Sequence, residues 1–135
     1  MALKFLVAYK GTPEGQRALE VGAEHARRFG ASLYVVTSHV GGAREKPEEV
    51  ARAQKELKEA KAHLADLELE AEVFETVRGM SAGEDLVRYA RDNRIDHIFV
   101  GVEKKSRTQK LILGSTAQYI ILKAHCPVTT VKRPT

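Results

Sequence analysis

Five β-rich runs alternate with four helical patterns along the chain, and this alternation limits the fold more than any other feature of the sequence. Strands that alternate with helices are typical of βαβ units, in which helices connect the strands of a parallel sheet. The predicted strands are residues 4–9, 33–38, 70–77, 98–100 and 128–131. The predicted helices are residues 13–29, 47–67 and 81–93, with a last helix that starts at 114–116. We therefore expect an α/β fold with one open parallel sheet and helices on both of its faces, because right-handed crossovers place them there.

Short polar signals mark the ends of the predicted helices. Thr12 can cap the first helix while Pro13 occupies its first position, where a missing N–H is harmless. Gly30 suits the left-handed position that follows the end of that helix. Ser81 and Glu84 have the spacing of a capping box at the start of the third helix. These signals support the helix boundaries independently of the hydrophobic pattern.

Length and composition predict one domain, residues 1–135, in the cytoplasm. A chain of 135 residues with 43% hydrophobic residues matches the size and composition of a single globular domain. It contains no run of about 20 apolar residues, the length that a membrane span needs. The apolar opening run is interrupted by Lys4 and is too short for a signal peptide. Cys126 is the single cysteine and cannot form an intramolecular disulfide, which favours a reducing compartment.

The charge of the chain is positive but mixed. The formal net charge is +4 and the isoelectric point is about 9.3, values that raise the question of nucleic-acid binding. Most basic residues alternate with glutamates along the helices, and only residues 103–110 concentrate positive charge. This segment lacks the interleaved aromatic side chains that stack on bases in single-strand binders. We expect solvated charge there, or a mobile cover over a phosphate site, rather than a nucleic-acid surface.

The polar residues give no sign of an enzyme or a metal centre. The five histidines lack metal-ligand spacing and are expected at surfaces or helix ends. They are His25, His39, His63, His97 and His125. Capping and solvation account for three aspartates, Asp85, Asp92 and Asp96. Cys126 precedes a proline at a strand start, where we expect packing rather than a nucleophile. No general acid and base fall together, and no metal-binding carboxylate is expected near a phosphate ligand, so we predict a binding protein.

The carboxyl edge of the sheet is where we expect a ligand site, because ligands of open parallel sheets bind beyond the strand ends. The segments expected there are 10–12, 37–38 and 101–116. Gly114, Ser115 and Thr116 start the last helix, where free N–H groups and the helix dipole favour an anion. Ser115 and Gln118 also have the spacing of an ordinary capping box. Local chemistry leaves both interpretations open.

The spacing of glycines in the second half of the chain resembles a known signature. Gly101 ends the fourth predicted strand, a polar loop follows, and Gly114-Ser115 opens the next helix thirteen positions later. This pattern resembles the G-x2-G-x9-G-[ST] signature of the universal stress protein family. The resemblance extends over essentially the whole chain, including FLVAYKGTPEGQRALE, VRGMSAGEDLVRYARDNRIDHIFVG and GSTAQYIILKAHCPVTTV. It implies a five-stranded sheet in the order 3-2-1-4-5 with two helices on each face, a Rossmann-like fold of the adenine-nucleotide alpha-hydrolase type. It also implies a homodimer and, in one branch of the family, an ATP site.

The resemblance assigns a nucleotide site to residues at the carboxyl edge. They are Tyr9, Lys10, Gly11, Thr12, Ser38, Val100, Gly101, Lys104, Gly114, Ser115 and Thr116. Two of them depart from the family, because Lys10 replaces an acidic residue that lies against the nucleoside and Lys104 replaces the second glycine. An ammonium group in place of a carboxylate removes an acceptor and adds a donor suited to anions. Two hypotheses follow. Helix amides and lysines hold ATP, another adenine nucleotide or another phosphorylated ligand, or the protein is a dimeric interaction module that has lost nucleotide binding.

The last predicted strand offers a surface for a second copy of the chain. It begins at Val128, ends at Val131 and is expected at an edge of the sheet. Edge strands present unpaired N–H and C=O groups, so we expect a homodimer through this strand.

Overall fold

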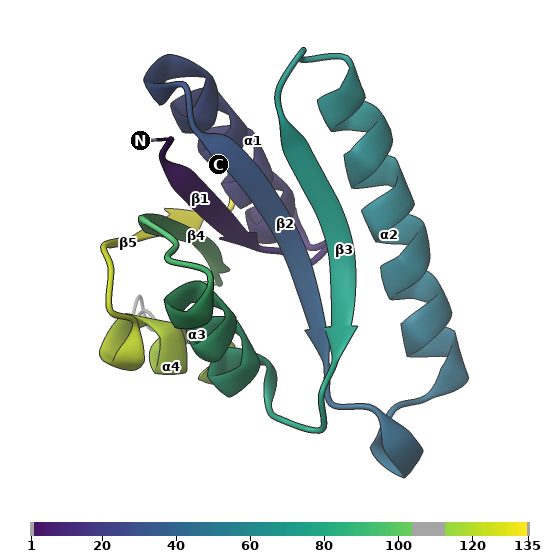
Figure 1. The fold of residues 1–135 in the computed structure, drawn as a ribbon. Helices are drawn as coiled ribbons and strands as arrows, with labels where there is room; N and C mark the ends of the chain where they lie inside the picture. The colour runs from purple at the N-terminus through teal and green to yellow at the C-terminus, as the bar shows by residue number, and fades with distance from the viewer. Residues whose placement is uncertain (1, 104–112, 135) are drawn as a thin grey trace.

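All five strands lie in one parallel sheet, in the order β3-β2-β1-β4-β5 (Figure 1). The computed structural model describes residues 2–103 and 113–134, without the side chain of Arg44. The strands are β1 (Lys4–Ala8), β2 (Ser32–His39), β3 (Ala71–Val77), β4 (His97–Val102) and β5 (Val128–Lys132). The helices are α1 (Pro13–Phe29), α2 (Pro47–Ala65), α3 (Ala82–Asp92) and α4 (Ser115–Lys123), with a 3-10 turn η1 (Gly42–Arg44) before α2. The strand order and the parallel pairing confirm the predicted fold.

Two helices cover each face of the sheet, also as predicted. Successive side chains of a strand point to opposite faces. In β1, Phe5 and Val7 therefore join the core under α1 and α2, whereas Leu6 joins the core under α3 and α4. In Figure 1, α2 runs beside the edge strand β3, and α3 and α4 lie together on the other face. Burial on both faces explains why the inner strands read as nearly continuous apolar runs.

Both caps of α1 form as predicted from the sequence, but the predicted cap of α3 does not form. The hydroxyl of Thr12 accepts a hydrogen bond from the amide of Gly15 at 3.1 Å, and Gly30 ends the helix with φ of 65°. Both observations confirm the predictions for α1. Ser81 precedes α3 but makes no side-chain capping bond among the described residues, so the capping-box prediction was wrong. Because Ser81 is exposed, water can solvate the first amides of α3 in its place.

Strand β4 is longer than the sequence predicted. The predicted strand covers residues 98–100 and ends at Gly101, a residue type that weakens strands. In the structure Gly101 and Val102 continue the ladder, because they pair with Val131 and Lys132 of β5. Pairing between strands that are distant in sequence therefore overrides the local preference.

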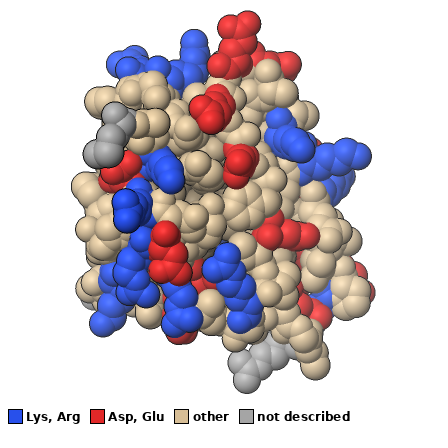
Figure 2. Space-filling model, viewed as in Figure 1, with Lys and Arg blue, Asp and Glu red and all other residues tan. Residues whose placement is uncertain are grey.

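The visible surface carries both signs of charge. Figure 2 shows Lys and Arg gathered mainly over the region where α3 and α4 lie in Figure 1, with Asp and Glu between them. The basic segment 104–110, for which solvated charge or a mobile cover was predicted, lies outside the described residues. Within the described chain, none of the helices combines the length and the apolar character needed to cross a membrane.

His97 makes the stability of the fold dependent on pH. Its ring stacks on Phe99 with centroids 4.6 Å apart, and its Nε2 lies 2.6 Å from Oγ1 of Thr129. Burial lowers the pKa of His97 below its ordinary value of 6.5, and the charge of His25 adds to this effect. The unfolded chain therefore binds a proton more readily than the folded chain, so this contribution is present above about pH 6.5 and is lost as the pH falls through the folded pKa.

We expect His97→Gln to reduce the loss of stability between pH 7.5 and 5.0. The comparison is the free energy of unfolding in urea at the two pH values, for the variant and for the parent. Titrating groups that do not interact with His97 contribute equally to both proteins, so the difference between them reports His97 together with its interaction with His25. An equal loss in both proteins would show that His97 does not titrate as inferred.

Candidate functional site

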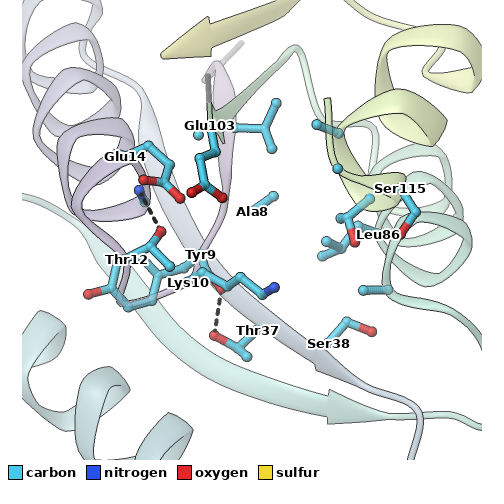
Figure 3. A pocket seen from close by; sticks show the side chains of 17 residues that line it. Ala8, Tyr9, Lys10, Thr12, Glu14, Thr37, Ser38, Leu86, Glu103 and Ser115 are labelled. Atoms are coloured by element: carbon cyan, nitrogen blue, oxygen red, sulfur yellow. Dashed lines mark hydrogen bonds between the residues drawn. The ribbon is translucent and has the colours of Figure 1, made fainter. Parts of the chain in front are cut away.

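A cavity of about 360 Å³ opens at the carboxyl ends of β1, β2 and β4 (Figure 3). From β1 the chain adds β2 and β3 on one side of the sheet and then β4 and β5 on the other. The cavity lies at this reversal of the strand order, which is the ligand position in open α/β sheets. Its volume falls within the range of small-molecule sites, about 300–1,000 Å³. The lining residues are Ala8, Tyr9, Lys10, Thr12, Glu14, Gly15, Thr37, Ser38, Ala82, Leu86, Val100, Gly101, Glu103, Gly114, Ser115, Thr116 and Ala117.

Most of the predicted site residues line this one cavity. They are Tyr9, Lys10, Thr12, Ser38, Val100, Gly101, Gly114, Ser115 and Thr116. Gly11 does not line it, and Lys104 lies outside the described residues. Sequence reasoning missed Glu14 and Glu103, which line it from the first turn of α1 and from the residue after β4.

The first turn of α4 is open toward the cavity. Gly114 takes the capping position, and within the described chain no side chain accepts a capping hydrogen bond there. The capping box of Ser115 and Gln118, one of the two interpretations that local chemistry left open, does not form, since the side chain of Gln118 donates instead to the carbonyl of Leu113 at 2.8 Å. Helix N-termini with unsatisfied amides attract anions, and the hydroxyls of Ser115 and Thr116 add further donors.

The end of β1 forms one wall through its main chain. The amide of Tyr9 donates to the carbonyl of Val36 at 2.9 Å, and the carbonyl of Tyr9 accepts from Oγ1 of Thr37 at 3.1 Å. The ring of Tyr9 belongs to the core under α1 and α2. Burial raises the pKa of its phenol, and Glu56 and Glu59 raise it further, so the hydroxyl stays neutral.

Gly101 brings β4 into direct contact with the start of α1. A Cβ atom at this position would lie 2.7 Å from the carbonyl carbon and oxygen of Glu14 and 2.8 Å from the amide nitrogen of Gly15. No side chain fits there without a shift of the helix backbone. Gly101 therefore fixes the wall of the cavity through packing, whatever it contributes to a ligand.

The charged side chains divide the cavity into two sides. In Figure 3 the carboxylates of Glu14 and Glu103 face one another on the side of α1, Lys10 extends across the cavity, and Ser115 lies on the far side. Glu14 is only 9% exposed. Neither carboxylate was assigned to the site from the sequence, and both lie on the side of the cavity away from Ser115. The described residues contain no group of three or more His, Cys, Asp or Glu that could hold a metal ion.

Asp85 is buried beside the cavity instead of being solvated, contrary to the prediction. It is 1% exposed, and its Oδ2 accepts hydrogen bonds from the hydroxyls of Ser38 and Thr76, each at 2.6 Å. The two hydroxyls come from the ends of β2 and β3, which the parallel sheet brings to the same edge. These bonds offset part of the cost of burying the carboxylate.

His39 and Cys126 lie outside the cavity. The prediction of a surface or helix-end position for His39 was wrong. Its ring lies between two carboxylates, with Nδ1 3.2 Å from Oε2 of Glu45 and Nε2 2.9 Å from Oε2 of Glu75. This contact links the connection between β2 and α2 to β3.

Cys126 packs against the core under α3 and α4, and burial raises the pKa of its thiol, in agreement with the predicted packing role.

Comparisons with known proteins agree with this fold. A family model described as the universal stress protein family matches residues 1–132. A universal stress protein of Mycolicibacterium smegmatis is 32% identical over 127 residues, covering 94% of this chain and 95% of that protein. The solved structure of a universal stress protein from Archaeoglobus fulgidus is 35% identical, with a TM-score of 0.86 over 98% of this chain and 99% of that chain. A second structure from that organism, a universal stress protein in complex with dAMP, is 31% identical, with a TM-score of 0.79 over 98% of both chains.

Proposed function

The chain belongs to the universal stress protein family, and from this premise we propose that it is a stress-response protein whose cavity binds an adenine nucleotide. The open first turn of α4 is the observation that carries the proposal. It offers amides to an anion at the wall opposite Glu14 and Glu103. The relative in complex with dAMP supports the choice of nucleotide.

The charges of the cavity give the bound nucleotide one orientation. The carboxylates of Glu14 and Glu103 repel a phosphate from the α1 side, whereas Ser115, Thr116 and the dipole of α4 attract it to the other side. Lys10 crosses the cavity between the two sides and supplies a cation that a phosphate can approach. The nucleoside then occupies the remaining volume along β1 and β2.

The first test is the nucleotide content of the purified protein. Denaturation followed by mass spectrometry of the supernatant is expected to release AMP, ADP or ATP, and adding millimolar nucleotide to the empty protein is expected to raise its melting temperature. An empty supernatant together with an unchanged melting temperature would refute nucleotide binding.

Two substitutions of Ser115 separate its hydroxyl from its amide. Ser115→Ala removes the hydroxyl alone, and we expect AMP affinity to fall about 2–10-fold. Ser115→Pro also removes the N–H, and we expect a further loss of about 10-fold or more, because hydrogen bonds to charged groups are stronger. Proline is tolerated at the first helical position, and the extended conformation of Gly114, with ψ of 161°, suits the residue before proline. Equal affinities for the two variants, measured by calorimetry at fixed salt, would contradict the role of the amide.

The alternative function is a dimeric interaction module without a nucleotide. Lys10 and Lys104 favour this alternative, because they stand where the family pattern has an acidic residue and a glycine. The double variant Lys10→Asp, Lys104→Gly distinguishes the two functions. Under the alternative it gains an affinity for ATP that the parent protein lacks, whereas under the leading proposal the parent already binds. We propose that the protein is not an enzyme under either function. Neither the parent protein nor the double variant is therefore expected to release phosphate from ATP above a protein-free blank.

Strand β5 is the surface through which we propose that two copies associate. It ends the sheet, and beyond β4 it has no neighbour among the described residues. Its outer N–H and C=O groups can extend the sheet into a second copy. The expected molar mass in solution is twice the 15.0 kDa of one chain, measured by light scattering at micromolar concentration. A mass equal to one chain would remove this part of the proposal.

A further inference from the structure

The end of β2 presents two hydroxyl groups to the cavity, and both of their hydrogens are already engaged within the protein. Oγ1 of Thr37 donates to the carbonyl of Tyr9 at 3.1 Å, and Oγ of Ser38 donates to Oδ2 of Asp85 at 2.6 Å. Both side chains line the cavity and are labelled in Figure 3. A hydroxyl group has one hydrogen and two lone pairs, so only lone pairs remain for a ligand.

Asp85 fixes the direction of the Ser38 hydrogen. The same oxygen, Oδ2, accepts from Ser38 and from Thr76, each at 2.6 Å, a distance typical of a hydroxyl that donates to a carboxylate. Neither hydroxyl can turn its hydrogen toward the cavity without abandoning this short bond to a carboxylate.

Stability of the fold does not explain why a carboxylate is buried at position 85. Its other oxygen, Oδ1, is buried without a hydrogen-bond partner among the described residues, and the nearest cation, Nε of Arg78, lies 3.6 Å away. A buried carboxylate with an unsatisfied oxygen destabilises a fold relative to a well-packed apolar side chain. A role in orienting Ser38 explains what the carboxylate contributes that an apolar residue would not.

We propose that Asp85 is a positioning residue that makes the β2 wall a hydrogen-bond acceptor, so that the cavity selects ligands presenting an N–H or O–H donor to it. The inference rests on the proposed nucleotide binding and adds its chemical selectivity. In an adenine nucleotide the donor is either the amino group of the base or a hydroxyl of the ribose. Both sources share this chemistry, and the choice of analogues distinguishes them.

The test compares the affinity of AMP with those of analogues that lack one donor each. Purine riboside 5′-monophosphate lacks the amino group, and 2′-deoxy- and 3′-deoxy-AMP each lack one hydroxyl. For the parent protein we expect one of these deletions to weaken binding about 5–10-fold, the effect of one hydrogen bond. The analogue that loses affinity identifies the group facing Ser38.

Asp85→Asn then tests the role of the carboxylate. The carboxamide can donate to Oγ of Ser38, which frees the Ser38 hydrogen to point into the cavity. We expect the penalty for the missing donor to fall to about 2-fold or less, while the protein stays folded by circular dichroism. Ser38→Ala should abolish the same penalty and covers the case in which the asparagine variant does not fold. Thr76→Val is the matched control, because Thr76 shares Asp85 but does not line the cavity; it should lower stability and leave the penalty unchanged.

The outcomes separate this inference from the proposed function. Nucleotide binding without any penalty for a missing donor, or a penalty that survives in a folded Asp85→Asn variant or in Ser38→Ala, overturns the inference and leaves the proposed function standing. Failure of the parent protein to bind any of the nucleotides overturns both.

Discussion

Replacing Phe99 with alanine is expected to lower the free energy of unfolding by about 3–5 kcal/mol. Phe99 is 0% exposed, and its ring lies among those of Phe5, His25 and His97, with centroids 5.7, 5.3 and 4.6 Å away. Small domains have a total stability of about 5–15 kcal/mol, so this loss is a large fraction of the whole. Urea denaturation followed by circular dichroism measures it.

The matched control is Leu122→Ala. Leu122 is 77% exposed on α4, so the same kind of truncation removes no packed contact from the core. We expect its effect to stay within about 0.5 kcal/mol. Similar losses for Phe99 and Leu122 would mean that the ring cluster under α1 does not anchor the sheet as described.

Gly101→Ala is expected to destabilise the fold by about 1–3 kcal/mol, the usual effect of overpacking. The new methyl group would meet main-chain atoms of Glu14 and Gly15 at 2.7–2.8 Å, and a backbone cannot turn aside as a flexible side chain can. Because this contact forms the wall of the cavity, the shift of α1 should also weaken nucleotide binding. Thermal and urea unfolding give the first effect, and calorimetry with AMP gives the second.

Gly114→Ala provides the comparison, since both glycines belong to the signature that identified the family. A Cβ atom at Gly114 meets no atom of the described residues within 4 Å, and the φ of −65° is accessible to alanine. We expect its stability to change by no more than about 0.5 kcal/mol. A loss of stability for Gly101→Ala as small as that for Gly114→Ala would show that the contact between β4 and α1 is looser than described. The signature therefore combines a glycine needed for packing with a glycine at the rim of the site.

Local signals predicted the fold because they act within a few residues. The alternation of strands and helices, the cap at Thr12 and the left-handed Gly30 depend on neighbours in sequence, and all appear in the structure. The two Ser-based capping boxes had the same kind of pattern and failed. Ser81 is exposed, and Gln118 reaches back to the carbonyl of Leu113. A capping pattern indicates which bonds a side chain can make, but solvent and competing acceptors decide whether it makes them.

The candidate site was predicted in its outline and not in its charges. The sheet edge follows from topology, so Lys10, Ser38 and Ser115 could be assigned to it from the sequence. The burial of Glu14 and Asp85 could not, because it depends on segments that are distant in the chain. Asp85 is stabilised by hydroxyls 47 and 9 residues away, and no local pattern links these positions.

The helix that carries the proposed phosphate site buries few of its residues. Helix α4 has nine residues and buries only Ala117 and Ile120, whereas α1 buries seven of its seventeen residues. Local unfolding starts in elements with few buried apolar contacts, so we expect α4 to open more readily than β1 and β4. A nucleotide that bonds to α4 and to β1 together would join the two parts and raise the local stability of α4 above that of the empty protein. Occupancy of the site would thus be expressed as the rigidity of one short helix rather than as a change of shape.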